Sequence, residues 1–271
     1  MEIAVLAVTP LVLGVVVGFW QINPVASAEY AAVGSEAHLL LEGFPDDRLV
    51  VEIAYQTTVG PPPGPSVATL LSRIHETCQK SVVQLDEHAF SSSQSSFSES
   101  QILTLESHVR QVWPTWGTMS LFYLYLGGSD SSNPGTLGMA YRGSSIAVFA
   151  GTIATASGAV GATAVTTTVL VHELGHELGL VGIVGYAPNE DPNHPYHSSD
   201  PSDVMYWAVE TTAISRLSGG PPNQFSAADL SDLTTVKKTF IYSEVIPWIV
   251  LALVGVVAGY LLVSQQRSLR R

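Results

Sequence analysis

One short segment of the chain, HELGHELGL at 172–180, contains residues that could bind a metal and activate water. Residues four apart share a face of an α-helix, so His172 and His176 can place two imidazole nitrogens on one zinc ion. Glu173 follows directly, and its carboxylate can take a proton from a metal-bound water and return it to a leaving amine. The spacing predicts a hydrolytic zinc site with Glu173 as general base. The alternative is that both histidines are ordinary exposed helix residues, since so short a pattern also occurs by chance.

A catalytic zinc ion needs a third protein ligand and one open position for water. The expected helix ends near Gly179, because glycine commonly permits a chain reversal at that place. Several side chains beyond it could supply the third ligand: Glu190, Asp191, His194, His197 and Glu210. A carboxylate ligand such as Glu210 would make the site similar to that of the gluzincins.

The segment resembles the metzincin signature H-E-x-x-H-x-x-G-x-x-H, and among metzincins it is most similar to the matrixins. In that family the third histidine follows the glycine by three residues, but Gly182 occupies this position here. The resemblance also implies a methionine turn eight residues after the third ligand. Met205 lies eight residues after His197 and eleven after His194. It therefore implies His197 as the third zinc ligand, displaced by an inserted surface loop at 182–196.

The same resemblance implies roles for residues around the metal. Met205 would pack beneath the ion without binding it. Tyr206 and Trp207 would lead into the wall of the substrate pocket, and TLGMAY at 136–141 would be an edge strand that pairs with an extended substrate. The ordinary alternative is that these residues only maintain the fold.

A further match follows the methionine turn. FSAADLSDL at 225–233 has Ser226 three residues before Asp229, which is typical of a capping box at a helix start. It resembles the C-terminal helix of the matrixins. The resemblance as a whole covers about 118–238, and it implies an α+β fold: a mixed twisted sheet with an active-site helix and a C-terminal helix.

The elements that must position these residues follow from the apolar pattern. Buried strands are expected at 48–55, 118–126 and 144–151, with the edge strand at 136–141. Apolar residues three or four apart predict helices at 67–85 and 101–112. Small residues and threonines from 156 lead into another helix, which carries the motif. The first of these places Cys78 in the core. Loops are expected at 91–100 and 127–135.

Both ends of the chain contain long apolar runs, 3–20 and 245–263. Each is long enough, at ~1.5 Å per residue, to cross a hydrocarbon layer of ~30 Å. Residues 1–28 are expected to be a signal peptide or an N-terminal membrane anchor, and 245–263 a transmembrane helix. The basic segment 264–271 then favours a cytoplasmic tail. Residues 29–244 would form an extracytoplasmic domain at the cell membrane.

Net charge and cysteine count argue against a nucleic-acid-binding protein and against a fold held by disulfides or a thiolate zinc cluster. The formal net charge of −12 argues against nucleic acid as a partner, because phosphate binding needs clustered Lys and Arg. Cys78 is the one cysteine, so the chain can form neither an intrachain disulfide nor a thiolate zinc cluster.

Together these features predict a membrane-anchored endopeptidase with one catalytic Zn²⁺, acting on protein or peptide substrates and contacting membrane lipid. Two other hypotheses remain at this stage. One is an intramembrane or gluzincin-type zinc protease, and the other is a non-catalytic receptor or adhesion ectodomain stabilised by zinc.

Overall fold

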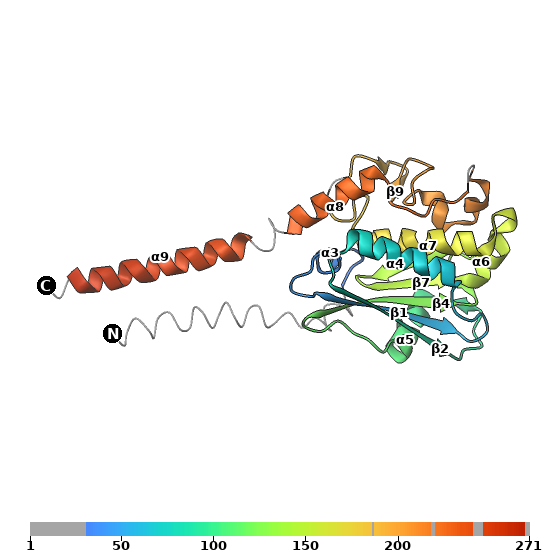
Figure 1. Cartoon of the computed structure of the whole chain (residues 1–271), viewed down its shortest axis with the longest axis horizontal. Coiled ribbons are helices and arrows are strands. Elements are labelled where there is room, and N and C mark those ends of the chain that lie inside the picture. Colours follow the sequence, from blue (N-terminus) through green and yellow to red (C-terminus); the bar gives the residue numbers. More distant parts are fainter. Residues whose placement is uncertain (1–30, 186, 218–219, 241–245, 269–271) are drawn as a thin grey trace.

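The computed structural model describes residues 31–185, 187–217, 220–240 and 246–268 (Figure 1). A five-stranded sheet lies at the centre, in the order β2-β1-β4-β7-β6. Its strands are β1 (Arg48–Gln56), β2 (Val82–Phe90), β4 (Thr118–Leu126), β6 (Gly138–Arg142) and β7 (Ser145–Phe149). Four of them are parallel, whereas β6 runs antiparallel to β7 and forms one edge. The expected strands, including the edge strand, are therefore confirmed.

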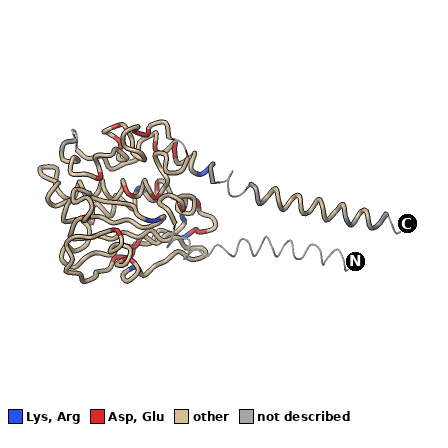
Figure 2. Tube along the Cα trace, turned by 180° about the vertical axis from the view of Figure 1, so that it is seen from behind, with Lys and Arg blue, Asp and Glu red and all other residues tan. Residues whose placement is uncertain are grey.

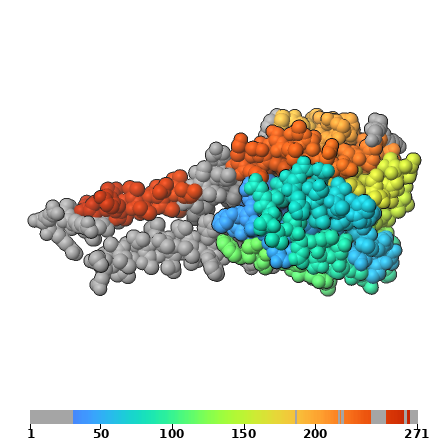
Figure 3. All heavy atoms as spheres, viewed as in Figure 1, coloured from blue at the N-terminus to red at the C-terminus, as the bar shows by residue number. Residues whose placement is uncertain are grey.

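Helices cover both faces of this sheet. The α-helices are α3 (Ala37–Leu41), α4 (Gly64–Thr77), α5 (Glu99–Val109), α6 (Ala150–Ala156), α7 (Ala162–Glu177), α8 (Ala227–Phe240) and α9 (Ile246–Ser268). Three short 3₁₀ helices are η1 (Gly158–Val160), η2 (Trp207–Glu210) and η3 (Thr212–Arg216). In Figure 1, α4 and α7 lie on one face and α5 on the other. Figure 3 shows α4 and α8 covering the side of the molecule turned to the viewer.

Residues 121–126 of strand β4 are all apolar, and the strand contributes to two separate cores. Its alternate residues Leu121 and Tyr123 belong to the core beneath α4 and α7. The residues between them, Phe122 and Leu124, belong to the core beneath α5. Successive side chains of a strand point to opposite faces, so a strand buried on both sides needs apolar residues throughout. This sheet places the site-bearing helix α7 firmly against one face.

The helix expected at 67–85 is shorter than the sequence predicts. Helix α4 ends at Thr77, and Cys78 adopts an extended conformation although it is buried in the core, as expected. Val82 and Leu85 lie in β2, which pairs in parallel with β1. The prediction was wrong beyond Thr77 because apolar residues of a partly exposed strand happened to continue the helical spacing.

The three expected loops contain short paired strands. Segments 91–100 and 127–135 contribute β3 (Ser96–Phe97) and β5 (Ser129–Asp130), which pair in parallel. The segment 182–196, expected to be an inserted loop, includes β8 (Glu190–Asp191), which pairs antiparallel with β9 (His194–Ser198). The prediction of a surface loop at 182–196 was therefore incomplete, since a hairpin forms at the end of this segment.

The C-terminal part of the chain contains α8 and α9. The capping box at the start of α8 is confirmed: the Ser226 amide donates to Asp229 Oδ2 at 2.9 Å, and the Asp229 amide donates to Ser226 Oγ at 3.1 Å. Helix α9 extends away from the rest of the described chain (Figure 1).

The expected transmembrane helix at 245–263 coincides with α9 but receives no support. Among the helices of the described residues, none has the length and apolarity required to span a membrane. The expected signal peptide or anchor at 1–28 falls outside the described residues. The membrane location and the cytoplasmic tail at 264–271 stay predictions.

Lys and Arg are distributed over separate elements. In Figure 2 the Lys and Arg positions along the described backbone are scattered, and Asp and Glu positions occur on several segments. That nucleic acid is not a partner stays a prediction from charge.

Candidate metal centre

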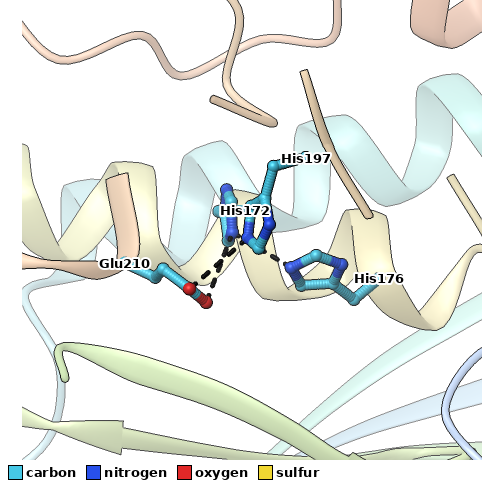
Figure 4. A group of neighbouring side chains, drawn as sticks. All are labelled: His172, His176, His197 and Glu210. Atoms are coloured by element: carbon cyan, nitrogen blue, oxygen red, sulfur yellow. Dashed lines mark hydrogen bonds and ion pairs between the residues drawn. The ribbon is translucent and has the colours of Figure 1, made fainter. Parts of the chain in front are cut away.

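Four side chains from three elements converge at one point. His172 and His176 come from α7, His197 from β9 and Glu210 from the end of η2 (Figure 4). One possible ligand atom from each lies within 4.8 Å of the others. This is the group of residues in the described chain that could hold a metal ion.

The spacing of these atoms suits a tetrahedral ion. His172 Nε2 lies 3.1 Å from His176 Nε2 and 3.9 Å from Glu210 Oε2. His197 Nε2 lies 3.5 Å from Glu210 Oε1. Ligand atoms ~2.0 Å from a zinc ion in tetrahedral geometry are about 3.3 Å apart. The nitrogen and oxygen atoms therefore fit zinc in both their chemistry and their spacing.

Backbone carbonyls orient two of the imidazoles. His172 Nδ1 lies 2.7 Å from the Val204 carbonyl oxygen, and His197 Nδ1 lies 2.9 Å from that of Pro195. A carbonyl accepts only from a protonated nitrogen, so each Nδ1 carries a hydrogen, and in the neutral ring Nε2 can offer its lone pair to the cluster. Histidines that bind a metal through one ring nitrogen usually donate a hydrogen bond from the other nitrogen to a carbonyl or carboxylate.

Burial keeps the two helix histidines neutral. It lowers the pKa of His172 to about 4, a shift that the Glu210 carboxylate opposes in part. Burial also lowers the pKa of His176 well below its ordinary value, and the neighbouring His172 and His197 lower it further. The His176 Nδ1 atom is buried and has no hydrogen-bond partner. Both imidazoles are therefore in the uncharged form that binds metals.

His197 and Glu210 form an ion pair at the edge of the cluster. Burial lowers the pKa of His197, but the hydrogen bond and the charge of Glu210 raise it, and the net shift is upward. For Glu210, burial raises the pKa, whereas the hydrogen bond with His197 and the charges of His172 and His197 lower it, so the net shift is downward. The Glu210 carboxylate is therefore ionised beside the three imidazoles.

Glu173 is fully buried next to this group. Burial raises its pKa well above the ordinary value, the Glu210 charge raises it further, and the backbone amide of Ala140 partly offsets both. Strand β6 comes very close to it, because a Cβ on Gly138 would lie 2.7 Å from Glu173 Oε1 and 2.6 Å from Val169 Cγ1. A glycine at 138 is thus what lets the edge strand approach the carboxylate.

Met205 is fully buried and lies close to α7 without joining the cluster. A Cβ on Gly175 would lie only 2.2 Å from its sulfur. The Met205 amide donates to Asp203 Oδ1 at 2.9 Å, and its carbonyl accepts from the Ser198 amide at 2.8 Å. The Met205 backbone is thereby hydrogen-bonded to the residue that follows His197.

A cavity of about 430 Å³ opens onto the site. Its lining includes Met139 and Ala140 of β6, together with Glu173, His197 and Tyr196. The sequence predicted a pocket wall near Tyr206 and Trp207, but among the described residues neither lines this cavity. The tyrosine at the cavity is Tyr196, beside the third histidine.

The other candidate ligands lie apart from the cluster. His194 Nδ1 is 3.2 Å from Asp191 Oδ2, and its ring stacks on Trp207 with centroids 4.3 Å apart and planes 8° apart. Glu190 Oε1 accepts from the Tyr196 amide at 2.9 Å. These side chains therefore stabilise the hairpin that carries His197.

The sequence predicts Glu210 only as an alternative to His197. It does not predict that Glu210 and His197 lie in the same group. Glu210 reaches the site because its carbonyl accepts from the Leu137 amide at 2.8 Å and Thr211 forms an antiparallel bridge with Thr136. Both contacts join segments that are far apart in the chain, so no local sequence pattern predicts them.

Comparisons with known proteins give distant structural similarities. No protein-family model and no curated protein matches the chain. Archaemetzincin from Methanopyrus kandleri is similar over 71% of this chain and 97% of its own, at 14% identity and a TM-score of 0.46. Archaemetzincin from Archaeoglobus fulgidus, complexed with malonate, covers 67% and 98% at 13% identity, with a TM-score of 0.41. Metalloproteinase-II from Bacteroides fragilis covers 75% and 60% at 13% identity, with a TM-score of 0.37. Because these values are low, function must be inferred from the site itself.

Proposed function

We propose that the chain is a zinc-dependent peptidase that hydrolyses peptide bonds in proteins or peptides. The observation that carries the proposal is that the imidazoles of His172, His176 and His197 converge beside the buried carboxylate of Glu173. This group lies at the wall of an open cavity. His172, His176 and His197 would hold one zinc ion, and Glu173 would serve as the general base. Met205 would support the site from beneath α7.

When bound, zinc would acidify a water molecule and polarise the carbonyl of the scissile bond. Glu173 takes a proton from the attacking water as the water oxygen bonds to the carbonyl carbon. It then gives this proton to the amine nitrogen as the carbon–nitrogen bond breaks.

The edge strand β6 supports an extended substrate. It forms one end of the sheet, and its residues Met139 and Ala140 line the cavity next to Glu173. An extended peptide can add to such an edge through main-chain hydrogen bonds, with little dependence on its own termini. We therefore favour an endopeptidase over an exopeptidase.

The decisive experiment replaces Glu173 alone. Glu173→Gln should retain stoichiometric zinc and lose peptide hydrolysis on the order of 10²-fold or more, because the amide cannot accept the proton of water. Glu87→Gln makes the same chemical change on the exposed face of β2 and should behave as the wild type. Equal activity of Glu173→Gln and the wild type would refute the proposal.

Two other functions are less well supported. A structural zinc in a non-catalytic ectodomain does not require the buried carboxylate of Glu173 at the cavity. In an intramembrane protease α7 would face lipid, but its second half is buried against other elements of the described chain. Stoichiometric zinc without turnover of any peptide in a broad library would favour the first of these.

A further inference from the structure

Within the function proposed above, we infer that Glu210 is a fourth, displaceable protein ligand that closes the metal site in the absence of substrate. The number of ligand atoms in the group bears on how the site is regulated. A hydrolytic zinc site keeps one position open for water, whereas a site with four protein ligands is closed. The described group contains four ligand atoms, so it corresponds to the closed form.

The carboxylate of Glu210 faces the histidines with both oxygens. Oε2 lies 3.9 Å from His172 Nε2, and Oε1 lies 3.5 Å from His197 Nε2. Figure 4 shows the side chain reaching the imidazoles from the side opposite His176. It therefore occupies the part of the group where a water ligand would otherwise have to bind.

The backbone of Glu210 is fixed, but its side chain is not enclosed. The Leu137 amide donates to the Glu210 carbonyl, and the Thr136–Thr211 bridge holds the next residue. The side chain is 31% exposed, whereas that of His172 is completely buried and that of His197 is 13% exposed. Rotation about side-chain bonds can move the carboxylate into the open cavity while the three histidines stay in place.

Displacement would exchange the carboxylate for water or a substrate carbonyl at the metal, and no covalent bond of the chain would change. The anchoring of Glu210 also couples this exchange to substrate. Leu137 directly precedes β6, the strand proposed to pair with the substrate, so a peptide on β6 would lie beside the segment that holds Glu210. The class of ligand that opens the site is thus an extended peptide.

The test uses the full chain loaded with Co²⁺, whose visible spectrum reports coordination, and with Zn²⁺, whose affinity is measured against a chelator. We expect Glu210→Ala and the conservative Glu210→Gln to change the Co²⁺ spectrum and to weaken zinc binding at least about tenfold. Acetohydroxamate, which binds metals at open positions, should bind the Co²⁺ form of Glu210→Ala at least tenfold more tightly than the wild type. Asp200→Asn, an exposed charge-matched change beyond β9, should leave all three quantities unchanged.

Two outcomes would overturn the inference. If spectra and zinc affinities of both Glu210 variants equal those of the wild type, Glu210 is not a ligand. If they change but acetohydroxamate binds Glu210→Ala no more tightly than the wild type, Glu210 does not occupy the position that a displacing ligand would take. The proposed function is tested separately by the loss of peptide hydrolysis in Glu173→Gln, so either hypothesis can fail while the other stands.

Discussion

Met205 lies directly against Gly175, so that a Cβ on the glycine would come within 2.2 Å of the methionine sulfur and 3.3 Å of a ring carbon of Phe225. Gly175 is the residue before His176 on α7. Met205 therefore touches the helix between its two histidines. This contact explains how a side chain that binds no metal can determine how α7 sits beneath the site.

Substitution of Gly175 should strain this contact. Gly175→Ala is expected to cost about 1–3 kcal/mol in the free energy of unfolding, because the added methyl displaces buried Met205. In the double variant with Met205→Ala, a favourable coupling of about 0.5–3 kcal/mol should appear, since the methyl partly fills the vacated space. Denaturant unfolding of the four proteins measures both quantities. Gly64→Ala is the control, because nothing lies within 4 Å of its Cβ position. Additive effects of Gly175→Ala and Met205→Ala on the free energy of unfolding would contradict the contact.

Gly138 should matter for catalysis more than for metal binding. An alanine there would push on Glu173 Oε1 and on Val169, and a displacement of about 1 Å at a catalytic group can cost on the order of 10²-fold in rate. We expect Gly138→Ala to lower kcat while zinc stoichiometry stays at the wild-type value. Steady-state kinetics and metal analysis of the same preparation check this, and an unchanged kcat would show that Glu173 tolerates the shift.

The two histidines of the hairpin should differ in their effect on zinc. His197→Ala removes a member of the cluster and should abolish tight zinc binding. His194→Ala removes only the stack on Trp207 and the pair with Asp191, and it should retain stoichiometric zinc. Zinc content after gel filtration distinguishes them. Loss of zinc in His194→Ala but not in His197→Ala would reverse the assignment.

Asp229 should make stability depend on pH. Burial, together with the hydrogen bond and charge of Asp203, raises its pKa from an ordinary 3.8 to about 8. The folded state therefore binds one more proton than the unfolded state between these values. Its contribution to stability is complete below pH ~4 and is lost as the pH rises towards 8, by about 1.4 kcal/mol per pH unit.

Asp229→Asn provides the measurement. The amide resembles the protonated carboxyl and can still accept from the Ser226 amide. The stability of the variant relative to the wild type should therefore increase from pH 5 to pH 8 in denaturant titrations. A constant difference across this range would mean that Asp229 does not hold the proton.

Sequence reasoning predicted the parts of the site that depend on local spacing. The helical repeat places His172 and His176 on one face, and the distance from Met205 singles out His197, which the structure brings to the same point. Glu210 could not be predicted in its place because the Leu137 and Thr136 contacts that hold it are long-range. In the fold, the fully buried strand β4 was predicted with its observed bounds. The helix at 67–85 was too long because Val82 and Leu85 follow a helical spacing while sheet pairing with β1 decides their structure.

The hairpin formed by β8 and β9 has a mechanical consequence. His176 ends its helix and His197 lies on β9, so an ion bound to both would tie together the two ends of the segment 177–196. Closing such a loop removes conformational freedom from the unfolded chain in the same way as a covalent cross-link. With Cys78 as its one cysteine, the chain has no disulfide to do this. The metal would thus stabilise the fold of segment 177–196 in addition to serving as the reactive centre.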